Sequence, residues 1–256
     1  MSKNFELLQQ AEIDVDSPSV AYGRPDSLSV GRIKKNKGGY RLGTKLEDRI
    51  AGEESYKLVQ NVFLLRREAA PRVVVFAGID SGNGCSAICA QTAHILAVQR
   101  LGTVCVVDSN LRSPILPELY GVGNHYGLTD SLLKQGAIRE FAKVVGPDNL
   151  WLLSCGSRAS ESQTLLNSDM MKRRIVELRK AFDYVLIDCP PLNIYADAVS
   201  IGQMSDGLVL ILEANVTRRE TAARVTENLR AAQINILGAV LNKRTYPIPA
   251  SIYNRL

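Results

Sequence analysis

The chain has 256 residues, enough for one large α/β domain with an appendage, and its 46% hydrophobic and 22% charged residues are ordinary for a soluble globular protein. No apolar run reaches the ~18 residues that span a membrane, and the first residues lack the charged-then-apolar pattern of a secretion signal. The five cysteines lack C-x-x-C spacing, which favours reduced thiols over disulfides or zinc ligands, so we expect a cytoplasmic protein.

Residues 1–50 are predicted to form a flexible basic arm before the folded domain. The formal net charge of +5 is concentrated between Arg24 and Arg49, where eight Lys or Arg accompany only three Asp or Glu. Such an arm could bind nucleic acid or an anionic membrane surface. A solvated linker is favoured over both, because Tyr40 is the only aromatic in this stretch that could stack on a base.

The rest of the chain alternates between helix and strand, starting with an amphipathic helix over residues 51–67. A mostly β-branched apolar run predicts a buried strand at 73–77, and a helix is expected from Cys85 to about Arg100. Further buried strands are predicted at 103–108, 150–154, 184–188, 207–212 and 236–241, and helices at 165–180 and 218–232. This alternation is typical of an α/β protein with a mainly parallel sheet covered on both faces. We therefore expect an arm at 1–50, one domain at 51–245 and a short tail at 246–256.

A glycine-rich loop joins the strand at 73–77 to the following helix. Its residues include Gly78, Gly82, Asn83, Gly84, Cys85 and Ser86. Strand, glycine-rich loop, serine and helix are the frame of a phosphate-binding P-loop, so the sequence predicts a P-loop NTPase fold. Backbone N–H groups and the positive end of the helix would bind phosphate, and Ser86 has the position of a Mg²⁺ ligand. The alternative is a tight strand-to-helix turn without a ligand.

Cys85 stands where a P-loop normally has the lysine before its serine. That lysine offsets negative charge that grows on the phosphates during transfer, and losing such a charged stabiliser commonly costs ~3–4 kcal/mol of barrier. Binding through backbone N–H groups and Mg²⁺ could persist without it. A second interpretation makes Cys85 a redox or covalent nucleophile, because a helix N-terminus lowers the pKa of a thiol.

Two aspartates end buried strands at the edge of the sheet where ligands bind in such folds. Asp108 opens an Asp-x-Asn-x-Arg segment that contains Asn110 and Arg112, and Asp188 ends a later strand. Asp188 could reach Mg²⁺, Asp108 could hold a metal-bound water or orient a nucleophile, and Arg112 could approach phosphate. A single aspartate in this position is more often a cap, but two beside a P-loop favour a functional site.

Seven stretches carry a resemblance to a known family. In chain order they are EESYKLVQN, the P-loop, VVDSNLRSP, GLTDSLL, NLWLLSCG, FDYVLIDCPPL, and the run from SDGLVLILEANVTRRE to GAVLNKR. Between about Glu53 and Arg244 the chain resembles the bacterial tyrosine kinases of capsule and exopolysaccharide synthesis, which belong to the partition-type P-loop ATPases.

The resemblance implies a set of roles for residues of this chain. Asn242 and its neighbours would contact adenine, and Asp108 and Asp188 would be the Walker A′ and Walker B carboxylates. ATP or ADP with Mg²⁺ would be the ligands, and a membrane polysaccharide copolymerase would be the partner. The sequence departs from the family pattern in the site itself, because Cys85 replaces the P-loop lysine and Asn110 replaces the second Walker A′ carboxylate.

The expected association helix and C-terminal tail depart from the pattern too. Members of the family form rings through a helix with Glu, Arg and Arg at three-residue spacing, and here these positions are Glu54, Lys57 and Gln60. Members also autophosphorylate a cluster of C-terminal tyrosines, whereas this tail offers only Tyr246 and Tyr253. Changes in catalysis, ring packing and substrate tail together indicate a pseudo-enzyme.

Three functions follow from these observations. The first is a catalytically impaired regulator of exopolysaccharide assembly, located at the inner face of the membrane through its partner or acting with an active paralogue. The second is a genuine tyrosine autokinase in which Arg112 replaces the missing lysine. The third is a partition or localisation ATPase, which Asp80 disfavours because that group has an additional lysine at this position.

Overall fold

The computed structural model describes residues 33–34, 41–42, 55–65, 70–156 and 162–244. Within the predicted arm, the strands β1 (Ile33–Lys34) and β2 (Arg41–Leu42) pair in antiparallel fashion. Most of the arm, Glu54 and the tail tyrosines Tyr246 and Tyr253 lie outside the described residues, so the predictions made for them stay predictions.

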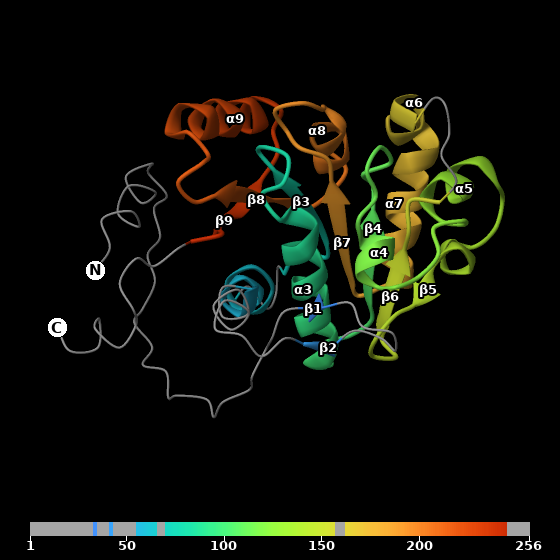
Figure 1. The fold of residues 1–256 in the computed structure, drawn as a ribbon. Helices are drawn as coiled ribbons and strands as arrows, with labels where there is room; N and C mark the ends of the chain where they lie inside the picture. The colour runs from blue at the N-terminus through green and yellow to red at the C-terminus, as the bar shows by residue number, and fades with distance from the viewer. Residues whose placement is uncertain (1–32, 35–40, 43–54, 66–69, 157–161, 245–256) are drawn as a thin grey trace.

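A seven-stranded sheet forms the centre of the domain (Figure 1). Its order is β5 (Lys143–Val144), β6 (Leu150–Leu153), β4 (Val104–Asp108), β7 (Tyr184–Cys189), β3 (Val73–Gly78), β8 (Gly207–Glu213) and β9 (Ile236–Asn242). All neighbouring strands are parallel except β5 and β6. The predicted mainly parallel sheet is confirmed, and the antiparallel edge strand β5 is an addition that the sequence did not reveal.

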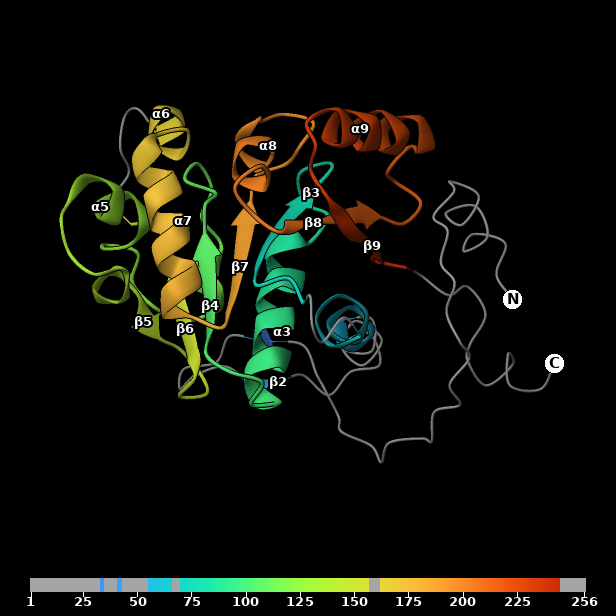
Figure 2. The ribbon, with the colours of Figure 1, turned by 180° about the vertical axis from the view of Figure 1, so that it is seen from behind.

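Helices cover both faces of the sheet (Figures 1 and 2). One face carries the helical segment at 55–59, its π-helical continuation η1 (Gln60–Leu64), α3 (Cys85–Val98) and α4 (Leu116–Leu119). The other carries α5 (Leu128–Leu133), η2 (Ile138–Phe141), α6 (Ser162–Leu166), α7 (Asp169–Ala181), α8 (Asp197–Gly202) and α9 (Arg219–Ala231). In the described part of the chain, none of these helices has both the length and the apolar character needed to cross a bilayer.

Side chains of β3 alternate between the two cores that these layers enclose. Val73 and Val75 belong to the core under α7, α8 and α9, whereas Val74 and Phe76 belong to the core under α3. All four are fully buried. A strand buried on both faces reads as a continuous apolar run, which is why the sequence indicated this strand so clearly.

The single helix predicted at 165–180 is wrong, because the structure divides this stretch into α6 and α7. Ser168 lies between them with an extended backbone, and its hydroxyl accepts a hydrogen bond from the Met171 N–H at 3.2 Å. This is the N-cap arrangement that starts a new helix. The serine therefore carried a signal for the break that helical periodicity alone obscured.

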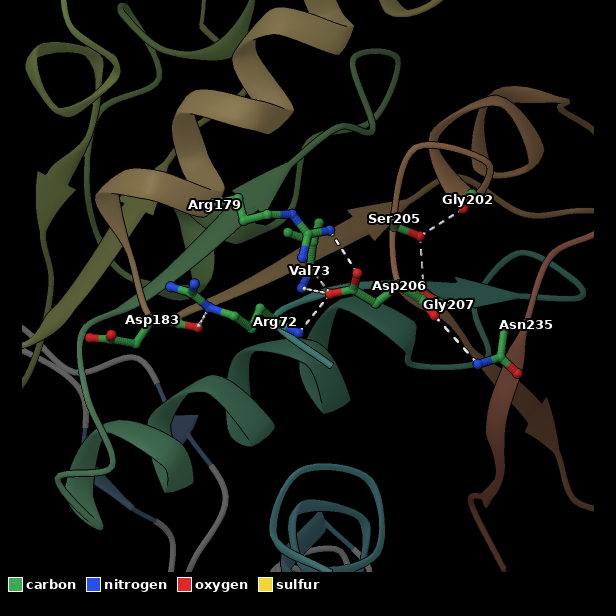
Figure 3. A network of polar contacts seen from close by, with 9 residues as sticks. All are labelled: Arg72, Val73, Arg179, Asp183, Gly202, Ser205, Asp206, Gly207 and Asn235. Carbon is green, nitrogen blue, oxygen red and sulfur yellow. Dashed lines mark hydrogen bonds and ion pairs between the residues drawn. The ribbon is translucent and has the colours of Figure 1, made fainter. Parts of the chain in front are cut away.

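A polar network holds the amino end of β3, at the edge of the sheet opposite the P-loop (Figure 3). Asp206 accepts backbone hydrogen bonds from Arg72 at 2.7 Å and Val73 at 2.8 Å. The guanidinium of Arg179 on α7 donates to both oxygens of the same carboxylate, at 2.9 and 2.7 Å. One carboxylate thus ties the start of the central strand to the end of a helix that covers it.

Candidate active site

The P-loop lies between β3 and α3, as predicted. Gly82 and Gly84 have φ values of +80° and +85°, a left-handed conformation that glycine adopts without strain. The first backbone hydrogen bond of α3 runs from the Ile88 N–H to the Gly84 carbonyl, so the N–H groups of the first turn have no partner within the helix, and that of Cys85 donates to the Asn83 side chain at 3.3 Å. Five residues separate Gly78 from Gly84, one more than the four of the standard P-loop spacing. The loop presents backbone donors and the positive end of a helix, which is the arrangement that binds phosphate.

Asp108 and Asp188 lie side by side, because they are register partners on the parallel strands β4 and β7. Asp108 is saturated with hydrogen bonds, since the backbone N–H groups of Asn110, Ile115 and Leu116 all donate to it at 3.1 Å. Burial, followed by the charge of Asp188, nevertheless holds the pKa of Asp108 well above its usual range. The two predicted Walker carboxylates are thus brought together, as the shared strand edge required.

Asp188 is almost completely buried, and neither of its oxygens has a hydrogen-bond partner among the residues that the structure describes. The Ser86 hydroxyl and the Cys85 thiol lie close enough to influence its pKa without making a hydrogen bond to it. Burial raises the pKa of Asp188 to about 6, and the nearness of Ser86 and Cys85 offsets part of this effect. A buried carboxylate without a partner points to a group that arrives with the ligand.

Cys85 is half-buried at the start of α3. Burial, followed by the charge of Asp188, raises its pKa well above the ordinary value, so the thiol is neutral at pH 7. Besides burial, the described groups that shift the pKa of Cys85 and Asp188 are the Asp188 carboxylate, neighbouring thiols and the Ser86 hydroxyl, and no positively charged side chain is among them. This neutral thiol does not supply the missing positive charge, and it lacks the thiolate character that a covalent or redox nucleophile needs.

Arg112, the cation predicted to replace the lysine, is held elsewhere. Its guanidinium donates to the Asp197 carboxylate at 2.6 Å and lies over the Tyr195 ring, 4.1 Å from the centroid. The Asp197 side chain is only 3% exposed, so this ion pair is well shielded from water. Nothing in the sequence connected Asp197 to Arg112, because 85 positions separate the two residues.

Asn83 and Asn242 both contact the P-loop. Asn83 is buried, and its side chain donates to the carbonyl of Ile211, two residues before the end of β8, at 3.1 Å. Asn242 at the end of β9 donates to the backbone carbonyl of Asn83 at 2.7 Å. The predicted adenine contact of Asn242 stays a prediction, whereas its contact with the loop is a finding.

Two further predicted positions lie nearby. Asn110 accepts a hydrogen bond from the Ser113 N–H at 3.3 Å and so stabilises its own loop. Asp80 accepts a hydrogen bond from the Asn193 side chain at 2.8 Å, which ties the P-loop to the segment after β7. Lys243 follows Asn242 and pairs with Glu213 at 3.1 Å. Arg112 and Lys243 at this edge of the sheet are thus both engaged in ion pairs, with Asp197 and Glu213.

The residues present partly fit a nucleotide with Mg²⁺. The unpartnered carboxylate of Asp188 beside the Ser86 hydroxyl suits a hard divalent cation, which takes one or two protein ligands plus phosphate oxygens. Among the described residues, no group of three His, Cys, Asp or Glu is arranged to hold a metal alone, so the phosphates would have to complete the site. The position of the usual P-loop lysine does not fit the nucleotide phosphates, because the neutral thiol of Cys85 brings no positive charge.

Comparison with known proteins finds bacterial tyrosine-protein kinases among the similar proteins. No protein-family model matches the chain. It is 28% identical over 214 residues to the tyrosine-protein kinase YwqD of Bacillus subtilis, covering 82% of this chain and 90% of that protein. It is 24% identical over 193 residues to the putative tyrosine-protein kinase CapB of Staphylococcus aureus, covering 75% and 84%.

Solved structures share the fold. The kinase domain of Escherichia coli tyrosine kinase ETK has a TM-score of 0.71 at 20% identity, covering 79% of this chain and 80% of that one. The chimerical protein CapA2B2 also has a TM-score of 0.71, at 22% identity and 76% and 85% coverage. The septum site-determining protein MinD of Pyrococcus horikoshii, complexed with Mg-ADP, has a TM-score of 0.57 at 21% identity and 72% and 76% coverage. The predicted P-loop NTPase fold and the resemblance to the bacterial tyrosine kinases are confirmed.

Proposed function

We propose that this chain, a homologue of the bacterial tyrosine-protein kinases, is a catalytically impaired member of that group and acts as a regulator of capsule or exopolysaccharide assembly. It keeps a phosphate-binding loop and binds ATP or ADP weakly. It does not transfer phosphate to tyrosine at a useful rate. The similarity to tyrosine-protein kinases supports the kinase class in this proposal. The chemistry of the site supports the impaired catalysis.

The observation that carries the proposal is the neutral thiol of Cys85 at the lysine position, where no positively charged side chain of the described residues shifts the pKa of Cys85 or Asp188. Phosphoryl transfer is catalysed mainly by positioning and by positive charge that stabilises the transferring group. Here Asp188 adds negative charge next to a neutral thiol, and Arg112 is held by Asp197 at 2.6 Å. The site therefore favours binding through backbone donors over catalysis.

Each residue of the site has a defined part in this binding. The backbone N–H groups at Gly84 and in the first turn of α3 would donate hydrogen bonds to the phosphate oxygens, and the α3 N-terminus adds its partial positive charge. Ser86 and Asp188 would hold Mg²⁺, which when bound neutralises part of the phosphate charge. Asp108, fixed by three backbone N–H groups, stiffens the loop beside Asp188 rather than offering a free oxygen.

A membrane polysaccharide copolymerase is the partner that we propose, with association into homo-oligomers or with an active paralogue as further contacts. The relatives include the tyrosine-protein kinase Wzc of Salmonella typhi, over 86% of this chain and 30% of that protein. The chain thus corresponds to one part of a much longer relative. We propose that it works in the cytoplasm at the inner face of the membrane, reached through that partner.

Incubation of the purified full-length chain with radiolabelled ATP and Mg²⁺ tests the impairment. We expect no phosphotyrosine, and we expect Cys85→Lys to tighten ADP binding at least about tenfold in calorimetry, because a charge-assisted hydrogen bond is worth about 1.5–3 kcal/mol. Cys85→Ser is the matched control and should bind ADP like the unmodified protein, since it adds no charge. Robust autophosphorylation of the unmodified chain at Tyr246 or Tyr253 would show an active kinase and overturn the proposal.

A further inference from the structure

The side chain of Asn83 lies beneath the P-loop instead of pointing away from it. Only 2% of the residue is exposed. Its amide nitrogen donates to the Ile211 carbonyl at 3.1 Å, and its amide oxygen accepts the Cys85 N–H at 3.3 Å. Asn83 therefore ties the loop to the carboxyl-terminal half of β8 and to the first residue of α3.

Asn242 fixes the same residue from the other side. Its amide donates to the Asn83 backbone carbonyl at 2.7 Å, the shorter of the two bonds that tie Asn83 to the strand ends. Asn242 is itself well placed, because it is the register partner of Glu213 in the β8–β9 ladder and its carbonyl accepts the Ala214 N–H at 2.9 Å. The side chain thus projects from a rigid strand end onto the loop.

The loop has room for these two amides only because of its glycines. A Cβ on Gly78 would overlap the Asn83 side chain, and a Cβ on Gly84 would overlap the Asn242 amide nitrogen. A Cβ on Gly82, by contrast, would meet nothing. The loop backbone therefore approaches both asparagines closely at the positions of Gly78 and Gly84.

These contacts determine how the peptide between Asn83 and Gly84 is oriented. In a trans peptide the carbonyl and the following N–H point in opposite directions. Because the Asn83 carbonyl points to Asn242, the Gly84 N–H points away from it, and this N–H has no hydrogen-bond partner among the described residues. A donor left free in this way is available to an anion.

We propose that Asn83 and Asn242 are positioning residues for phosphate, forming an asparagine clamp that orients the free Gly84 N–H before a phosphate chain binds. The inference rests on the weak nucleotide binding proposed above. It gives Asn242 a role toward the loop in place of the adenine contact that the resemblance implies. Preorganised backbone donors lower the cost of ordering on binding, and this matters most in a loop without its lysine.

A role of Asn242 in the clamp and a role in adenine contact predict the loss of different ligands. Binding of two parts of the nucleotide, one with phosphates and one with the base, therefore distinguishes the two roles. Pyrophosphate with Mg²⁺ carries the phosphates without a base, and adenosine carries the base without phosphates. We expect Asn242→Leu and Asn83→Ala to weaken pyrophosphate binding about tenfold in calorimetry on the full chain. Adenosine binding should be the same in Asn83→Ala as in the unmodified protein.

Asn235→Ala is the matched control, because Asn235 immediately precedes β9, at the end of the strand opposite Asn242, and also donates its amide to a backbone carbonyl, that of Asp206 at 3.4 Å. This variant should bind pyrophosphate within about twofold of the unmodified protein. If Asn242→Leu lost adenosine binding and kept pyrophosphate binding, the adenine contact would be right and the clamp wrong. If the unmodified chain failed to bind pyrophosphate at millimolar concentration, the clamp would also be overturned, while the absence of phosphotyrosine would still support the regulator.

Amide hydrogen exchange gives a readout that needs no ligand. The Cys85 N–H bonds to the Asn83 side chain, so we expect its protection to fall in Asn83→Ala and in Asn242→Leu but not in Asn235→Ala. Amides of the β3 strand should keep their protection in all three variants. Unchanged exchange of the Cys85 N–H in both Asn83→Ala and Asn242→Leu would show that the two asparagines do not order the loop.

Discussion

Asp188 and Asp108 are neighbours with the same chemistry and opposite surroundings. Three backbone N–H groups donate to Asp108, whereas Asp188 has no hydrogen-bond partner among the described residues. Burial raises the pKa of Asp188 to about 6 and holds that of Asp108 well above its usual range. The two carboxylates titrate as a coupled pair, so removing the charge of one should lower the pKa of the other.

We expect Asp188→Asn to stabilise the ligand-free protein at pH 7.5 by about 3 kcal/mol, since a carboxylate pKa raised by about two units corresponds to this free energy. The folded state holds its proton up to about pH 6, whereas the unfolded carboxyl loses it near pH 4. The free energy of unfolding of the unmodified protein should therefore fall as the pH rises from about 4 to 6, and Asp108, whose pKa is raised as well, adds to this fall. Urea titrations of both proteins at several pH values measure this difference.

Ser86→Ala serves as the control, because it alters the same pocket without removing the buried charge. It should keep the fall in stability that starts near pH 4 and extend it to higher pH, because the Ser86 hydroxyl lowers the pKa of Asp188. A pH profile that is the same in Asp188→Asn and the unmodified protein would mean that Asp188 is solvated or paired in solution.

At the level of elements, the Asp206 network holds β3 and α7 together (Figure 3). Partial burial raises the pKa of Asp206, but the donors from Arg179, Val73 and Arg72 outweigh it, and the pKa lies below its usual value. A lowered carboxyl pKa contributes stability above the unfolded value near 4, and this contribution is lost as the pH falls through the folded value.

Asp206→Asn should destabilise the fold by about 1–2 kcal/mol at pH 7, because it weakens charge-assisted hydrogen bonds at a site that is partly open to water. The difference from the unmodified protein should shrink as the pH falls below about 4. Thermal unfolding at pH 7 and at pH 3.5 measures both effects. Asp169→Asn, which removes an exposed carboxylate paired with Lys172, should change stability at most slightly at either pH.

The sequence predicted some elements much better than others. The strands β3, β4, β7 and β8 are buried on both faces, so their continuous apolar runs stood out. Short elements such as α4 and α5 span barely one or two helical turns and left no periodicity to recognise. The antiparallel β5 has only two residues, and both are exposed.

The same division holds for the site. The glycines, Ser86 and the two strand-end aspartates follow from a motif and from the shared edge of a parallel sheet. The pairing of Arg112 with Asp197, 85 positions apart, and the clamp between Asn83 and Asn242, 159 positions apart, join segments with no local signal. Such contacts depend on side-chain directions in the folded molecule, which sequence spacing does not encode.

At the scale of the whole molecule, the sheet separates two cores, and the one under α3 depends on the helical segment that precedes β3. The segment at 55–64 places Val59 and Phe63 in this core, each at most 1% exposed. The Phe63 ring meets that of Tyr184 edge to face at a centroid distance of 5.7 Å. This segment thus closes the face of the sheet against which the P-loop helix packs.

Phe63→Ala should lower the free energy of unfolding by about 3–4 kcal/mol, because it leaves a cavity between this segment and β7. Val176→Ala is the control, since Val176 is 51% exposed on α7 and should cost little. A chain that starts at residue 70 should lose more stability than the point variant, because the whole apolar face against α3 becomes exposed to water. Chemical denaturation of the three proteins measures the order of these losses, and equal stability of the shortened and full chains would mean that the segment at 55–64 is no part of the folded domain.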